Sequence, residues 1–281
     1  MTTPTAAPEP FSAEGAALIE AGYPLEAVEP LRQAVAGGEP SGPDLLARAY
    51  LESRSWHAAV EWLTPLVQAG HVRFAGALGL ALVETGPREQ AEDMLRLAVD
   101  SGDLTAANDL AMLMRDEGRA REAVLVLVRA ADAGEPYAGA NLVELHLDAG
   151  DLPAAIEAAE RYAADSRPET LVVLAEVRAQ QGHLDEAEGL YRRAAQLGAM
   201  RAHTAYGGFL QLARNDWAGA EREFREAERR AEPGWATALG RFLLDDGRPA
   251  EARGYLQLAA DDGDATAAEA LIDLDGDPTD D

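Results

Sequence analysis

The chain has 281 residues, of which 47% are apolar but only 6% aromatic, a composition that favours closely packed, alanine-rich helices over a β-sandwich. Its formal net charge is −26, and all 24 basic residues are arginine. This charge disfavours nucleic acid and anionic membranes as partners and favours cationic ones, although acidity also serves simply to keep a protein soluble.

The chain begins with a segment, residues 1–10, that contains proline, threonine and alanine but no basic stretch followed by an apolar run. We expect a disordered leader there and no signal peptide. Nowhere do 18 apolar residues stand in succession, so no membrane-spanning segment is predicted.

Residues 11–274 repeat with a period of 32 residues and a single step of 33. An alanine marks the register in eight copies: Ala27, Ala59, Ala91, Ala123, Ala155, Ala187, Ala220 and Ala252. Five residues before each of these anchor alanines stands a glycine, or Arg54 and Asn215 in two copies, where a helix must end and the backbone is expected to need positive φ. Each copy is therefore predicted to be a helix, a tight turn and a second helix.

The first helix of each copy carries a mostly small residue twelve positions before the anchor alanine, which allows neighbouring helices to approach closely. These residues are Gly15, Ala47, Gly79, Ala111, Val143, Ala175, Gly208 and Gly240. Between copies a second glycine recurs, with Ser166 and Ala231 in its place in two copies, and is expected to end the second helix.

The last copy is followed by residues 265–274, which are predicted to form a ninth first helix without a partner, serving as a polar cap. Residues 275–281 are predicted to be an acidic, disordered tail. The predicted fold class is thus all-α, an α-α superhelix (solenoid) of eight helix-turn-helix repeats of about 32 residues plus a C-terminal capping helix.

A leucine followed by a small residue, a glycine at the turn and a Glu-Ala pair in the second helix, as in Glu122 and Ala123, recur along these copies. This pattern resembles the tetratricopeptide repeat and its Sel-like relatives, although the period of 32 is shorter than the usual 34. The resemblance implies that first helices line a concave groove that binds other proteins.

Catalytic motifs are missing from the sequence. It contains no Walker-type loop, GxSxG elbow or HExxH helix, and its five histidines are scattered over different copies. The absence of cysteine excludes disulfides and thiolate ligands and fits a cytoplasmic location. We therefore predict no catalytic residues, no metal site and no cofactor.

A recurring acid stands seven residues before the anchor alanine in six of the eight copies, at Glu20, Glu52, Glu84, Asp116, Asp148 and Asp245. The resemblance places this position on the groove, where such a row would attract a basic segment. The alternative is that these residues are ordinary solvated acids.

The sixth and seventh copies break the acidic pattern with Gln180 and Ala213, and Phe209 and Leu212 make the same lining apolar. We hypothesise an apolar anchor pocket near Phe209 that accepts a helix or an extended peptide. The alternative is that Phe209 and Leu212 bury against the neighbouring copy.

The sequence thus predicts a non-enzymatic, cytoplasmic adaptor or scaffold that binds a protein or peptide, with a basic segment as the expected partner and no nucleic acid or membrane. Two alternatives stay open: a regulatory or substrate-presenting subunit of an enzyme complex, and a structural homo-oligomer.

Overall fold

The computed structural model of the chain describes residues 9–276 and confirms the all-α prediction, because every regular element among those residues is helical. The predicted leader and tail lie largely outside the described residues. The chain divides into two compact units, with the boundary between Glu135 and Pro136. None of the described helices is long and apolar enough to cross a membrane.

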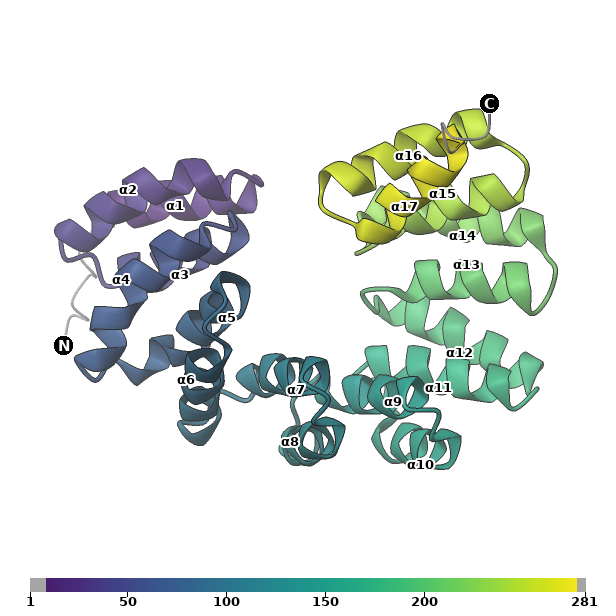
Figure 1. Cartoon of the computed structure of the whole chain (residues 1–281), viewed down its shortest axis with the longest axis horizontal. Helices are drawn as coiled ribbons and strands as arrows, with labels where there is room; N and C mark the ends of the chain where they lie inside the picture. The colour runs from purple at the N-terminus through teal and green to yellow at the C-terminus, as the bar shows by residue number, and fades with distance from the viewer. Residues whose placement is uncertain (1–8, 277–281) are drawn as a thin grey trace, which may run out of the picture. The chain divides into compact units, whose positions relative to one another are not determined.

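Unit 1 contains consecutive pairs of helices that lie side by side (Figure 1). Its helices are α1 (Pro10–Glu20), α2 (Pro24–Ala36), α3 (Gly42–Glu52), α4 (Trp56–Gln68), α5 (Ala75–Thr85), α6 (Arg88–Asp100), α7 (Ala106–Asp116) and α8 (Ala120–Asp132), with a short 3-10 helix, η1 (Val72–Phe74), before α5.

Unit 2 continues the same pattern (Figure 1). Its helices are α9 (Ala138–Asp148), α10 (Leu152–Tyr162), α11 (Glu169–Gln180), α12 (Leu184–Leu197), α13 (Ala202–Leu212), α14 (Trp217–Arg230), α15 (Trp235–Asp245), α16 (Pro249–Asp261) and α17 (Ala265–Asp275). The last of these is the predicted ninth first helix, and the Asp264 carboxylate caps it by accepting hydrogen bonds from the N–H groups of Thr266 and Ala267.

The anchor alanines form the centre of each helix pair. All eight have an exposed fraction of 0%. They lie on the second helices, and a Cβ added to Gly15, Gly79 or Gly240 on the facing first helix would come within 2.8 Å of a leucine side chain on the paired second helix. The core is therefore built by the close approach of two helices at small residues, as the repeat pattern predicted.

The turns within the pairs adopt the predicted backbone conformation. The residue five positions before each anchor alanine has positive φ in every copy, including Arg54 at +53° and Asn215 at +54°. Between pairs, Ala231 takes the place of a glycine at φ +50°. The sequence periodicity therefore located left-handed positions even where the residue is not glycine.

Two details of the predicted register are wrong. Ser166 does not end the second helix, because α10 already ends at Tyr162 and the chain then turns through an isolated bridge of Ala164 with Arg167. In α13 the closely packed glycine is Gly207, whose added Cβ would lie 2.8 Å from Phe224, whereas a Cβ on Gly208 would meet nothing within 4 Å.

The second difference has a simple cause. The extra residue of the 33-residue step lies in the turn between α13 and α14, which leaves four residues outside the helices where the turn between α15 and α16 leaves three. Counting back twelve residues from Ala220 through this longer turn therefore stops one residue short, at Gly208 instead of Gly207. Leu212, the last residue of α13, therefore corresponds to Asp245, the last residue of α15.

Candidate functional site

The first helices of the pairs provide the surface on which the predicted site residues lie, and we call this surface the first-helix face. In unit 1, α1, α3, α5 and α7 each contact the next in this series. Glu20, Glu52 and Asp116 are the last residues of α1, α3 and α7, and Glu84 is the last but one of α5. All four are exposed, so unit 1 carries the predicted acidic row.

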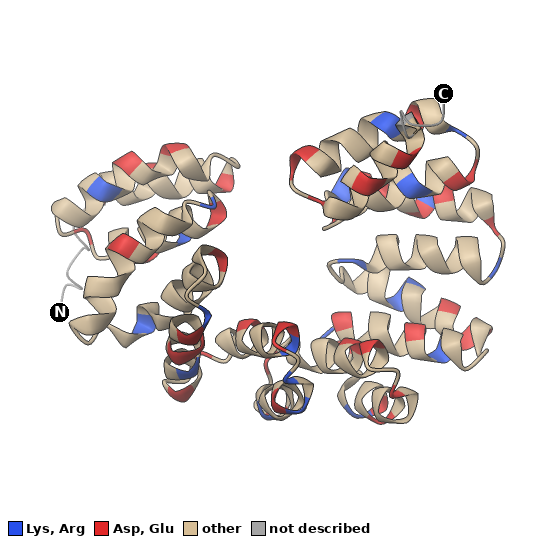
Figure 2. Ribbon diagram, in the orientation of Figure 1, with Lys and Arg blue, Asp and Glu red and all other residues tan. Residues whose placement is uncertain are grey.

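Part of this charge is paired locally. Glu52 accepts a hydrogen bond from Nε of Arg48 at 2.5 Å, and Asp116 lies 3.3 Å from the guanidinium of Arg115. Acidic residues are also spread over first and second helices of both units (Figure 2). The acidity is thus a property of the whole chain and is not confined to the row.

In unit 2 the row is interrupted. Asp148 ends α9 and Asp245 ends α15, but Gln180 and Leu212 occupy the corresponding ends of α11 and α13. Asp245 accepts a hydrogen bond from the Gln211 amide at 2.9 Å. The two acids of unit 2 are therefore separated by an amide and by an apolar side chain.

The two apolar residues of the predicted site have different environments. Leu212 is 83% exposed. Phe209 is 6% exposed, and its ring lies against Tyr191 and Tyr206 with centroid distances of 5.1 and 6.3 Å. Phe209 is thus a core residue, and the expected anchor pocket does not form around its ring because that ring is already packed.

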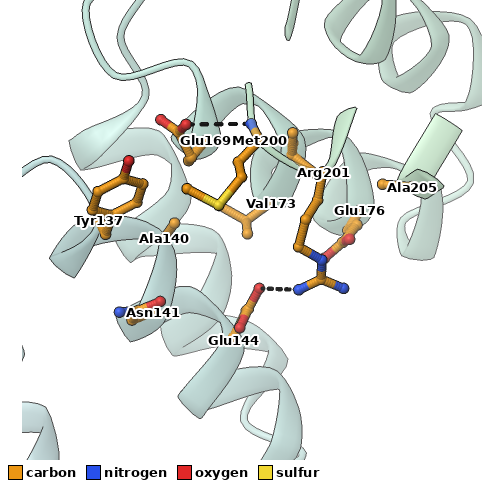
Figure 3. A pocket seen from close by; sticks show the side chains of 11 residues that line it. Tyr137, Ala140, Asn141, Glu144, Glu169, Val173, Glu176, Met200, Arg201 and Ala205 are labelled. Carbon is orange, nitrogen blue, oxygen red and sulfur yellow. Dashed lines mark hydrogen bonds and ion pairs between the residues drawn. The ribbon is translucent and has the colours of Figure 1, made fainter. Parts of the chain in front are cut away.

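A different pocket does form on the first-helix face of unit 2. It has a volume of about 190 Å³ and is lined by residues of α9, α11 and α13 and of the segments that precede them. Ala140, Val172 and Val173 make a buried apolar floor, while Tyr137 and Met200, at 40% and 46% exposure, stand at its edge (Figure 3). Three successive first helices thereby contribute to one cavity.

Carboxylates add charge to this apolar pocket. Glu144 on α9 lies 3.6 Å from the guanidinium of Arg201, and Glu169 accepts a hydrogen bond from the N–H of Met200 at 3.4 Å (Figure 3). Glu176 on α11 also lines the pocket, but within residues 9–276 its carboxylate has no hydrogen bond or ion pair. The pocket therefore holds one partly buried acid that makes no hydrogen bond or ion pair, on which Arg201 acts only through its charge.

The surroundings of Glu176 disfavour its ionised form. Burial is the main cause, followed by the negative charge of Glu144, and together they raise the pKa of Glu176 to about 7 against the opposing effect of Arg201. In unit 1 burial, with Asp103 and Glu135 nearby, raises the pKa of Asp109 to about 6. A pKa near neutrality makes Glu176 sensitive to any charge that enters the pocket.

The sequence pattern contained a signal for the two carboxylates that was missed. Glu144 and Glu176 both stand eleven residues before an anchor alanine, Ala155 and Ala187. This position is one helical turn before the predicted acidic position and therefore lies on the same face of the helix. Met200 and Arg201 come from a connecting segment, whose placement no helical register predicts.

Within the described residues no group of three or more histidine, aspartate or glutamate side chains is arranged to hold a metal ion.

Comparisons with known proteins identify the fold. Neither a family model nor a curated protein matches the chain. Among solved structures, a tetratricopeptide repeat protein from Parabacteroides merdae is 14% identical with a TM-score of 0.54, and the match covers 94% of this chain and 96% of that chain.

Two further solved structures are similar. A chain of the APC/C hetero-tetramer Cut9-Hcn1 is 14% identical with a TM-score of 0.53, and the match covers 94% of this chain but 55% of that chain. A thermophilic TPR protein from Thermus thermophilus is 19% identical with a TM-score of 0.49, covering 60% of this chain and 100% of that chain. The two matches with TM-scores above 0.5 therefore show that the chain has a tetratricopeptide-like helical repeat fold, as the sequence resemblance indicated.

Proposed function

We propose that the chain is a non-enzymatic adaptor that binds a segment of a partner protein on the first-helix face of unit 2. The observation that supports this proposal is the pocket between α9, α11 and α13, which combines a buried apolar floor with exposed side chains at its edge. Pockets of this composition suit an inserted side chain, and the backbone of an extended peptide or a helix can follow the neighbouring surface.

The proposed partner segment is basic. The pocket contributes Glu144, Glu169 and Glu176 against a single cation, Arg201, among the residues that line it. The acidic row of unit 1 is a second surface that favours the same class of partner. A second copy of the chain is a poorer candidate, because it carries the same net charge of −26.

The proposal also places the protein in the cytoplasm and gives it no nucleic acid or membrane partner. These parts rest on the absence of cysteine and on the acidic composition. A salt titration tests the electrostatic part, since binding of a basic segment to an acidic surface weakens as ionic strength rises.

The experiment that tests the proposed function is a selection from a random peptide library displayed on phage, with the full chain as bait. We expect enrichment of peptides that combine basic and apolar residues. The same selection on Ala205→Trp, which places a large ring in the pocket, should not enrich these peptides.

Two controls make the selection specific. Ala250→Trp introduces the same ring at an exposed position on the second helix α16 and should leave the enrichment unchanged. The proposal is wrong if wild type and Ala205→Trp enrich the same peptides, or if neither enriches any.

A further inference from the structure

We propose that the pocket of unit 2 receives one arginine or lysine side chain of the partner, with its aliphatic stem on Val172 and Val173 and its cationic end at the Glu176 carboxylate. This inference rests on the proposed function, since it names the chemistry of the group that the same surface binds. It rests on three observations: the apolar floor, the unpartnered acid and the position of Arg201.

The floor suits a hydrocarbon stem and not a small ion. Val173 is 2% exposed and Val172 is 8% exposed, so their side chains offer a surface from which water is largely excluded. Lysine and arginine place their methylene groups on apolar surface while the charged end reaches a polar group. The cavity of about 190 Å³ is several times the ~30 Å³ that one water molecule occupies, so it has room for a long side chain.

The polar group at the end of this floor is Glu176. It lies on α11 and lines the pocket, and its carboxylate is drawn beside the Arg201 guanidinium, on the side away from Glu144 of α9 (Figure 3). A carboxylate in such a place is costly unless it is paired or protonated. A guanidinium or an ammonium group would supply both the charge and the hydrogen bonds that Glu176 lacks.

Arg201 does not supply the hydrogen bonds that the Glu176 carboxylate lacks. The ion pair that its guanidinium makes is with Glu144, at 3.6 Å, and the Arg201 side chain is 58% exposed. The charged and titratable groups that face Glu176 are thus Glu144 from α9, Arg201 from the segment before α13 and Tyr191 from α12. Burial, and then the charge of Glu176, raise the pKa of Tyr191, so its hydroxyl stays neutral. The net charge of the groups around the pocket is therefore negative.

The raised pKa of Glu176 makes the affinity for a cationic side chain depend on pH. With a pKa of about 7, the carboxyl is partly protonated at neutral pH, and a cation binds only after that proton has left. Affinity for a cationic side chain should therefore increase as pH rises through 7 and level off above it.

A direct test uses Nα-acetyl-arginine N-methylamide, its lysine counterpart and its norleucine counterpart as probes. The chain is labelled with ¹³C at its methionine methyl groups, so that Met200 reports from the edge of the pocket and the buried Met114 serves as an internal reference. At about pH 8 we expect the arginine or lysine probe to shift the Met200 signal, and the norleucine probe to do so at least about tenfold more weakly.

Two variants separate the charge from the fold. Glu176→Gln should weaken binding of the cationic probes by about tenfold, or roughly 1.4 kcal/mol, and should abolish its increase with pH. Glu157→Gln, at an exposed position on α10, should bind like wild type. Circular dichroism of both variants confirms unchanged helix content.

The inference is overturned if norleucine binds as tightly as arginine and lysine, if Glu176→Gln leaves the affinity unchanged, or if none of the probes shifts Met200. In each of these cases the proposed function is still decided separately, because the peptide selection and its Ala205→Trp counterpart do not depend on which side chain enters the pocket.

Discussion

At the residue scale, single positions in this fold carry identifiable strain. Ala231 ends α14 with φ +50° and ψ +44°, although its Cβ makes this conformation unfavourable by about 1–2 kcal/mol relative to glycine. Its side chain is exposed, so no packing is lost on substitution. We therefore expect Ala231→Gly to raise the free energy of unfolding by about 1 kcal/mol in urea denaturation.

The control is Ala133→Gly, at the exposed C-cap of α8, where φ is −78°. This substitution should not stabilise the protein, because the alanine there is unstrained. Equal effects of the two substitutions would show that the left-handed conformation at residue 231 has no energetic consequence.

A second prediction at this scale concerns Glu176 and stability. Its pKa of about 7 lies above the value of about 4.5 that a glutamate has in an unfolded chain, so between these values the folded state holds a proton that the unfolded state lacks. Stability should therefore fall as pH rises through this window. Glu176→Gln should be more stable than wild type at about pH 8, by an amount on the order of 1–3 kcal/mol, and the difference should vanish near about pH 4.5.

The measurement is urea denaturation at several pH values. Asp109, with its pKa of about 6, contributes a slope of the same sign that remains in the variant. A constant difference between wild type and Glu176→Gln over this pH range would contradict the assignment of the raised pKa to Glu176.

At the scale of helices, acids from the segments between pairs cap the first helix of the preceding pair. Glu232 is 5% exposed, and its carboxylate accepts hydrogen bonds from the N–H groups of His203 and Thr204 at 3.2 and 2.9 Å and from the Thr204 hydroxyl at 3.0 Å. Glu39 does the same for Phe11 and Ser12 at the start of α1. These caps link consecutive pairs.

Glu232→Ala should accordingly lower the free energy of unfolding by about 1–3 kcal/mol, because it leaves buried donors at the N-terminus of α13 without acceptors. Glu157→Ala, at an exposed position, should change it by less than about 0.5 kcal/mol. Thermal unfolding followed by circular dichroism distinguishes the two. Similar small losses in both variants would mean that the cap adds little to stability.

The helices also show what the sequence could predict. The register of the anchor alanines located eight fully buried positions and the left-handed turns, because a core residue and a helix end are set by local spacing. The pocket required knowledge of which side chains from three helices meet, and Met200 and Arg201 reach it from a connecting segment. The sequence left Phe209 open between an anchor pocket and the core, because its position in the repeat does not reveal the aromatic rings that pack on it.

At the scale of the whole molecule, the excess of 50 acidic over 24 basic residues opposes the folded state through mutual repulsion. Salt screens this repulsion, since the Debye length falls from about 30 Å at 0.01 M to about 3 Å at 1 M. The melting temperature should therefore rise with sodium chloride concentration over this range. A melting temperature that falls with salt would mean that the ion pairs outweigh the repulsion.

The claim central to this account is that a partner segment binds in the pocket of unit 2. The most direct measurement is the ¹³C-methyl methionine spectrum during titration with a peptide obtained from the selection, because Met200 lies in that pocket while Met112, 38% exposed, lies on the first-helix face of unit 1. We predict that the Met200 signal shifts with saturation while the signals of Met112 and of the buried Met114 stay in place. A peptide that binds without moving Met200 would contradict the account.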